Sequence, residues 1–155
     1  LEGPAPAFRR RALVVNSNLH KTLVVEVRAG VTDRFPVLAH LSYTPDDPFA
    51  VTVVFSHDGR VLARWRLDRD MLLEGLRRPV GCGDVRLRPE DRGAARELRM
   101  DFLGEAHADG SRHHAVVFVW AEAVGEFLTE THRMVAPGSE QVRVDDFLAD
   151  VLAGS

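Results

Sequence analysis

The chain has 155 residues, of which 45% are hydrophobic and 28% are charged, the balance expected of one globular domain. This composition excludes a disordered chain, a collagen-like repeat and a small scaffold held by disulfides. The net charge of −3 excludes a strong overall attraction to phosphate. Cys82 is the only cysteine, so no internal disulfide and no cysteine-based zinc site can form, and a cytoplasmic location is expected.

Two further features of the sequence concern the membrane and the distribution of charge. The longest apolar run covers residues 115–121, whereas a membrane-spanning helix needs about 20 such residues, and residues 1–7 do not resemble a signal peptide. Residues 60–99 contain eleven arginines against seven acidic residues, whereas residues 122–155 contain seven acidic residues against two arginines. These unlike regions favour attraction to other copies or to a partner, although separate solvated faces explain them equally well.

Residues 1–15 are expected to form a flexible lead-in rich in turn formers, and residues 16–155 a single domain. Most of the domain alternates apolar and polar residues, the pattern of half-buried antiparallel strands. Such strands are predicted at residues 22–27, 37–43, 51–56, 61–67 and 98–102. Residues 115–120 are apolar throughout and predict a strand buried on both faces. Turn-forming residues at 45–48, 57–59 and 108–110 separate these segments.

The strand at residues 98–102 gives a specific expectation about its two faces. Leu98, Met100 and Phe102 should be buried in the core. Their neighbours on the other face should point to water or to a partner; these are Glu97, Arg99 and Asp101.

Three helices are predicted between and after the strands. Asp68 is a candidate N-cap for residues 69–77, and Pro79 ends that helix. Residues 121–134 carry an apolar stripe at helical spacing. Asp145 is a candidate N-cap for a last short helix. The fold class is therefore α+β, dominated by antiparallel sheet, with seven or eight strands and three helices.

No arrangement of residues indicates catalysis or metal binding. His113 and His114 are adjacent on a strand and would point to opposite faces, so they cannot share one metal ion. Cys82 has no cysteine or histidine partner evident in the sequence, which favours a passive thiol in a turn. The glycines on either side of it match neither phosphate-loop pattern, and a strand follows where a helix is needed. Neither an enzyme nor a bound cofactor is expected.

Arginines on the polar faces of the strands are the candidate binding residues. Arg64, Arg66, Arg86 and Arg88 are candidates for contact with a partner, although a solvated side chain is the favoured interpretation of each one alone. Arginines interleaved with aromatic rings would form a surface for single-stranded nucleic acid. The alternation places Trp65 and Phe102 on the opposite, apolar face, which weakens that alternative. A small hydrolase or metal enzyme is a third, less favoured alternative.

Several long motifs resemble one known family. These are LSYTPDDPFAV at residues 41–51, Trp65, RDMLLEGLRRPVGCGDVR at 69–86, FLTET at 127–131 and VAPGSE at 135–140, followed by Asp145. Together they resemble the SsgA-like proteins, which are sporulation-specific cell division proteins of actinomycetes. The resemblance covers residues 16–152, and the chain length fits the short members of the family. The residue between the two glycines of the longest motif is usually small in the family, whereas here it is Cys82.

The resemblance implies a fold, an assembly and a function. The implied fold is Whirly-like, with two antiparallel sheets and helices, assembled as a homotrimer. The implied function is non-enzymatic: the protein marks septum sites and recruits the division protein FtsZ, together with other SsgA-like proteins, and nucleic acid is not the expected ligand. The alternative is a single-stranded nucleic-acid-binding protein of the same fold. Gly75, Gly81, Gly83 and Asp84 are candidates for a structural turn, with an exposed recognition loop as the alternative.

Overall fold

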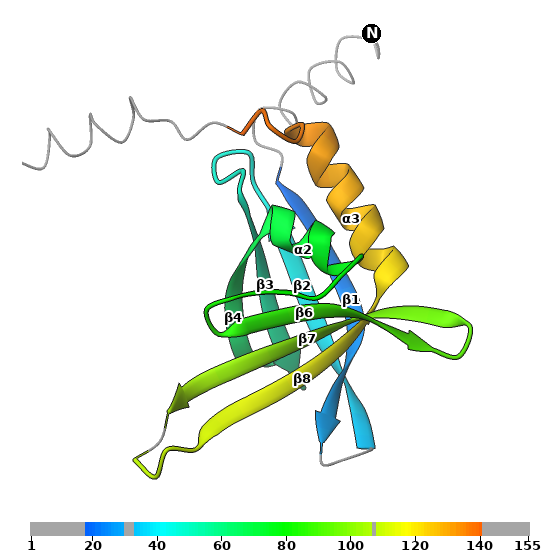
Figure 1. The fold of residues 1–155 in the computed structure, drawn as a ribbon. Coiled ribbons are helices and arrows are strands. Elements are labelled where there is room, and N and C mark those ends of the chain that lie inside the picture. The colour runs from blue at the N-terminus through cyan, green and yellow to red at the C-terminus, as the bar shows by residue number, and fades with distance from the viewer. Residues whose placement is uncertain (1–17, 30–32, 107, 141–155) are drawn as a thin grey trace, which may run out of the picture.

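The computed structural model describes residues 18–29, 33–106 and 108–140. Its strands and helices follow one another along the chain in this order (Figure 1): β1 (Leu19–Ala29), β2 (Asp33–Tyr43), β3 (Ala50–His57), β4 (Arg60–Asp68), α2 (Arg69–Gly75), β5 (Val80–Cys82), β6 (Val85–Arg92), β7 (Ala95–Ala106), β8 (Arg112–Trp120) and α3 (Ala121–Met134). Each predicted strand lies within one of these longer strands. No helix in the described ranges is both long and apolar enough to cross a membrane.

The prediction of two separate sheets is not confirmed. The described strands form a single eight-stranded sheet in the order β4-β3-β2-β1-β8-β7-β6-β5. Each half of this sheet is a meander of four neighbouring strands, and β1 pairs with β8 where the halves meet. Only two residue pairs join these strands, Glu26 with Phe118 and Val27 with Val117, whereas β1 and β2 pair along their full length. The two halves are therefore joined through a short junction.

The halves incline steeply toward each other and make a half-barrel (Figure 1). Inside it, the Phe102 ring of β7 lies 5.6 Å from the Phe55 ring of β3 and 4.6 Å from the Trp65 ring of β4. Leu72 of α2 and Phe127 of α3 belong to the same buried cluster as these strands. The concave face of the sheet and the two helices thus share one core.

The burial of β7 and β8 confirms most of the predicted pattern. Leu98, Met100 and Phe102 are buried, as the alternation predicts. In β8, residues 116–119 are buried on both faces, whereas Ala115 and Trp120 at the ends of the predicted run are exposed. The second face of β8 is covered by long polar side chains rather than by a second hydrophobic layer, as described below.

Two of the three predicted helices are present in the described residues. The Asp68 side chain accepts a hydrogen bond from the Met71 N–H at 3.0 Å, which confirms the predicted N-cap of α2. This helix ends at Gly75, two residues before the predicted end, and the N–H groups of Arg77 and Arg78 both donate to the Glu74 carbonyl in the turn that follows. The bounds of α3 match the prediction. The predicted helix after Asp145 and the lead-in at residues 1–15 lie outside the described residues.

A buried arginine ties α2 to the end of α3. Arg69 is 1% exposed, and its guanidinium donates hydrogen bonds to the carbonyls of Thr131 and Val135 at 3.2 and 2.8 Å. It also donates to the Glu140 carboxylate at 2.5 Å and lies over the Tyr43 ring. This places a positive charge at the C-terminal end of α3, where free carbonyls and the helix dipole favour it. The hydrogen bond from Arg69 lowers the pKa of Glu140.

Glycines in the two helices provide a matched pair of substitutions. A Cβ at Gly75 would lie 2.8 Å from the Leu87 Cβ, whereas one at Gly125 would meet only the Leu76 Cδ1, at 3.9 Å. Gly75→Ala should therefore lower the free energy of unfolding by about 1–3 kcal/mol through overpacking. Gly125→Ala should raise it by about 0.5–1 kcal/mol, because alanine favours the helix. Urea denaturation measures both, and the same sign for the two changes would contradict this packing of α2 on β6.

The Arg69–Glu140 pair predicts a defined pH dependence. The pKa of Glu140 lies below its ordinary value of 4.5 in the folded protein, so between the two values the unfolded chain binds the proton first and stability rises with pH. The stability lost in Glu140→Gln should be largest near neutral pH and should shrink as the pH falls through the lowered pKa. Urea denaturation as a function of pH measures this, with Glu130→Gln on the exposed side of α3 as the control. A difference that does not change with pH would rule out the pairing.

Candidate partner-binding surface

The structure places the four candidate arginines in two separate pairs. Arg64 and Arg66 lie on β4, at one end of the sheet, and Arg86 and Arg88 lie on β6, close to the other end. All four are exposed on the face opposite the core, as the alternation predicts. Five strands separate β4 from β6 in the sheet order, so the four side chains do not form one patch.

The pair on β4 borders an apolar row that crosses the outer face of the first half-sheet. Val24, Leu38 and Val61 are 63%, 40% and 52% exposed. Strand pairing places Val24 opposite Leu38, Leu38 opposite Ser56 and Ser56 opposite Val61, so one row spans four strands. The sequence pattern does not reveal this row. Leu38 occupies a position that the alternation assigns to water, but the alternation places Val61 on the core face, and it reaches the outer face because the register shifts between Phe55 and Ser56.

The two arginines beside this row differ in their contacts. Arg66 donates two hydrogen bonds to the Asp47 carboxylate, at 3.0 and 2.7 Å, and this pairing raises the pKa of Arg66. Arg64 lies opposite Val54 in the neighbouring strand and has no ion-pair partner among the residues that the structure describes. Arg64 therefore offers a free positive charge next to the apolar row.

The pair on β6 lies at a groove of about 460 Å³ over β5, β6 and β7. Arg86, Arg88, Arg99 and Asp101 line this groove together with residues 79–81. A Cβ at Gly81 would lie 2.5 Å from the Arg86 Cδ, so glycine at this position leaves room for the arginine side chain to lie across β5. The glycine of the motif thereby helps to shape the groove.

The other residues of the predicted turn have structural contacts. Gly83 has a φ of +57°, which favours glycine at the tip of the β5–β6 hairpin. The Asp84 carboxylate accepts a hydrogen bond from Arg112 at 2.7 Å, and its carbonyl accepts one from the Leu103 N–H at 2.8 Å. Gly75 packs against Leu87. These contacts support the interpretation of Gly75, Gly81, Gly83 and Asp84 as structural.

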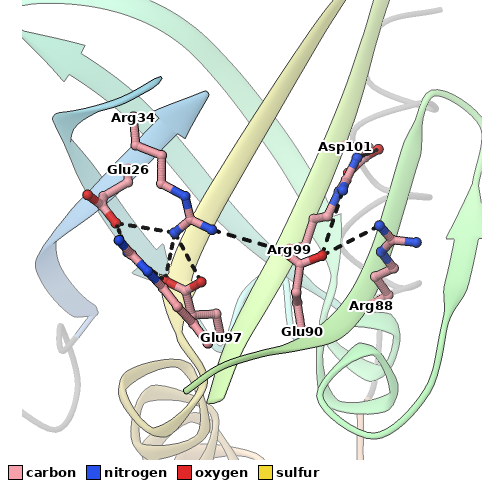
Figure 2. A network of polar contacts seen from close by, with 8 residues as sticks. Glu26, Arg34, Arg88, Glu90, Glu97, Arg99 and Asp101 are labelled. Carbon is pink, nitrogen blue, oxygen red and sulfur yellow. Dashed lines mark hydrogen bonds and ion pairs between the residues drawn. The ribbon is translucent and has the colours of Figure 1, made fainter. Parts of the chain in front are cut away.

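A network of charged side chains covers the outer face where the two half-sheets meet (Figure 2). Arg34 of β2 donates hydrogen bonds at 3.1 Å to both carboxylate oxygens of Glu97 on β7 and one at 3.3 Å to Glu26 on β1. Its guanidinium carbon lies 3.6 Å from the centroid of the Phe118 ring. Arg92 of β6 also donates to Glu26, at 2.8 Å. The network thus connects the two half-sheets across the short β1–β8 junction.

This network corrects the expectation that Glu97, Arg99 and Asp101 face water. Glu97 is only 3% exposed, and the side chains of Arg99 and Asp101 are 14% and 20% exposed. Burial alone would raise the pKa of Asp101, but hydrogen bonds from Arg99 and His114 outweigh it and lower that pKa. These residues are part of the folded architecture, so they are not free to contact a partner.

The described residues hold no group of three His, Cys, Asp or Glu side chains placed to bind a metal ion. His114 is 3.1 Å from the Asp101 carboxylate, and His113 is the preceding residue of the same strand. Cys82 is exposed in β5. The Trp65 and Phe102 rings lie between the half-sheets, apart from the arginines of the outer face.

The fold defines a class of small proteins in which one antiparallel sheet bends into a half-barrel around two helices. The family model "Streptomyces sporulation and cell division protein, SsgA" matches residues 37–140. The chain therefore belongs to the SsgA family, which confirms the resemblance found in its motifs. This is a family of sporulation and cell division proteins.

Named relatives agree over most of the chain. The sporulation-specific cell division protein SsgB of Streptomyces coelicolor is 34% identical over 143 residues, 91% of this chain and 97% of that protein. The SsgB of Saccharopolyspora erythraea is 33% identical over 136 residues, 86% of this chain and 92% of that protein. The predicted likeness to the short, SsgB-like members is thereby confirmed.

Solved structures agree in fold. One of them, described as "Mutations in SsgB correlate to longitudinal cell division during sporulation of Streptomyces coelicolor", matches with a TM-score of 0.70 and 30% identity, over 80% of this chain and 93% of that one. The SsgA-like sporulation-specific cell division protein of Thermobifida fusca matches with a TM-score of 0.75 over 86% and 95% of the two chains. At 24% identity this second match supports the fold alone.

The junction network predicts a large and selective loss of stability. Arg34→Gln leaves Glu97, which is 3% exposed, with Arg92 at 3.9 Å as its remaining ion pair among the described residues. The free energy of unfolding should fall by about 3–5 kcal/mol, because a buried carboxylate loses its main partner. Arg34→Gln combined with Glu97→Gln should recover part of this loss, since both charges are then removed. Urea denaturation measures each variant.

A control separates this effect from a general loss of charge. Arg60→Gln removes an exposed arginine of β4 and should change the stability by less than about 0.5 kcal/mol. If Arg34→Gln were no more destabilising than Arg60→Gln, the junction would not depend on the network.

Proposed function

We propose that this protein is a non-enzymatic adaptor of sporulation-specific cell division, which marks septum sites and recruits FtsZ. Its membership of the SsgA family and its likeness to proteins named SsgB support a role in sporulation division. The observation that carries the adaptor function is the apolar row of Val24, Leu38 and Val61 beside the unpaired Arg64. Exposed apolar side chains next to an available arginine are typical of surfaces that bind another protein.

The proposed assembly is a homotrimer located at the division septum, with FtsZ and other SsgA-like proteins as partners. The end strand β4 supports self-association, because its nine residues pair with β3 on one side only. Val61 and Leu62 on this strand are 52% and 55% exposed. Repeated copies of one binding surface would strengthen contacts that are weak individually, which suits a protein that marks a position in the cell.

The two aromatic rings nearest in sequence to the candidate arginines do not support the nucleic-acid alternative. A surface for single-stranded nucleic acid places aromatic rings beside its arginines so that bases can stack on them. In this protein the rings of Trp65 and Phe102 contact each other inside the half-barrel, at 4.6 Å between centroids. The net charge of −3 provides no general attraction to phosphate.

The experiment that tests the proposed function is cellular. Deleting the gene in its sporulating host, while following fluorescent FtsZ, should abolish the regular ladders of FtsZ at sporulation septa. Reintroducing the wild-type gene should restore them. A variant with Leu38→Asp and Val61→Asp should fail to restore them, because two charges would interrupt the apolar row without altering the core.

Two measurements keep this test decisive. Circular dichroism of the purified double variant should match the wild type, and Thr52→Asp, on the same outer face but outside the row, should restore the ladders. Normal FtsZ ladders in the deletion strain would refute the proposed function. Tight, salt-sensitive binding of the purified protein to single-stranded DNA, without affinity for FtsZ, would support the alternative instead.

A further inference from the structure

A second surface is distinct from the apolar row: the groove over β5, β6 and β7. It has a volume of about 460 Å³ and is lined by three arginines, one aspartate and residues 79–81. It lies on the half-sheet that carries β6, whereas the apolar row lies on the half-sheet that carries β4. The charged side chains of the groove that have no ion-pair partner within the protein determine which kind of ligand it can bind.

The internal contacts leave one guanidinium group without an ion pair and a second one in a long, partly exposed ion pair. Arg99 donates hydrogen bonds of 2.7 and 3.1 Å to the two Asp101 oxygens, so these two residues satisfy each other. Arg86 donates to the carbonyls of Gly83 and Val85 at 3.0 and 3.3 Å. Strand pairing places Asp101 opposite it, but Asp101 is held by Arg99, and Arg86 has no ion pair within the described ranges. The ion pair of Arg88 with Glu90 is 3.5 Å long, and both side chains are partly exposed. The groove therefore carries positive charge that the fold itself does not neutralise.

The spacing of these two arginines selects an extended ligand. Arg86 and Arg88 are two residues apart on one strand, so they project from the same face about 7 Å apart. Carboxylates on alternate residues of an extended peptide have the same spacing. Arginine pairs with carboxylates through two parallel hydrogen bonds, which gives such a match both strength and direction.

Other features of the groove favour a peptide over a nucleic acid. Among the residues that the structure describes, its lining contains no aromatic ring on which a base could stack. Pro79 and Val80 provide apolar contact for side chains between the charged positions of a peptide.

We propose that this groove binds an extended acidic segment of the division partner, with carboxylates at alternate positions that pair with Arg86 and Arg88. This inference rests on the proposed function, because it gives the recruited division protein a second contact in addition to the apolar row. Gly81 is a positioning residue in this site, since the absence of a side chain lets Arg86 lie across β5.

Fluorescence anisotropy with a labelled synthetic peptide of alternating glutamate and threonine tests the site. The wild-type protein should bind this peptide, and it should bind the matched peptide of alternating glutamine and threonine much more weakly. Arg86→Gln with Arg88→Gln should weaken binding by about tenfold or more, which corresponds to about 1.4 kcal/mol. Arg86→Lys with Arg88→Lys should recover part of the affinity, because the charges remain but the paired hydrogen bonds do not.

The control variant removes the same number of positive charges elsewhere. Lys21 and Arg60 are exposed on β1 and β4, so Lys21→Gln with Arg60→Gln should leave peptide binding unchanged. Equal losses in the two double variants would show a general charge effect and would overturn the proposal. Equal binding of the two peptides by the wild type would also overturn it. So would a labelled single-stranded oligonucleotide that binds more tightly than the peptide and depends on Arg86 and Arg88.

Co-sedimentation with purified FtsZ distinguishes this inference from the proposed function. If the wild type does not bind FtsZ, the proposed recruitment fails, while the peptide measurement still decides the chemistry of the groove. If the wild type and the Arg86→Gln, Arg88→Gln variant bind FtsZ equally, recruitment stands and the groove is not its contact. Loss of both peptide and FtsZ binding in this variant, with the control variant unaffected, is the expected result.

Discussion

The fold depends on how Arg34 holds the two half-sheets together. The β1–β8 junction contains only two residue pairs, which is little backbone hydrogen bonding between two halves of four strands each. Arg34 adds a side-chain connection: its guanidinium lies 3.6 Å from the centroid of the Phe118 ring and donates to Glu97 and Glu26. These contacts depend on one another. The buried Glu97 carboxylate needs a cation nearby, and the Arg34 guanidinium that supplies it also covers the Phe118 ring, which would otherwise be exposed.

The same network decides which arginines remain available for binding. Arg34 and Arg99 lie in the middle of the outer face, where acidic side chains surround them and limit their exposure. Arg64 and Arg86 lie toward opposite ends of the sheet and have no carboxylate partner in the described part of the chain. The arginine count of residues 60–99 therefore overstates the positive charge that a partner can meet. The positive charge that is accessible on this face therefore lies toward its ends rather than in its middle.

The local features of the fold could be predicted from sequence, because they depend on residues close together in the chain. Alternation over Leu98, Met100 and Phe102 predicts their burial, and Asp68 caps the helix that follows it. The joining of the half-sheets could not be predicted, because the pairing of Arg34 with Glu97 links residues 63 positions apart. A period of two assigns a residue to a face of the sheet but says nothing about what else lies on that face. For the same reason the alternation predicts four equivalent arginines where the structure has two unlike pairs.

The longest motif of the family connects this architecture to the proposed groove. Its first part contains Arg69, which fixes the end of α3, and Gly75, which lets α2 pack closely on β6. Its last part contains Gly81, over which the side chain of Arg86 lies. One continuous segment therefore contains both the residues that position the helices, Arg69 and Gly75, and the glycine that makes room for the Arg86 side chain. Because α2 packs against the strand that carries Arg86 and Arg88, the position of these two arginines depends on the core contacts of the same motif. A structural role for its glycines is thus compatible with a binding role for its arginines, and the second requires the first.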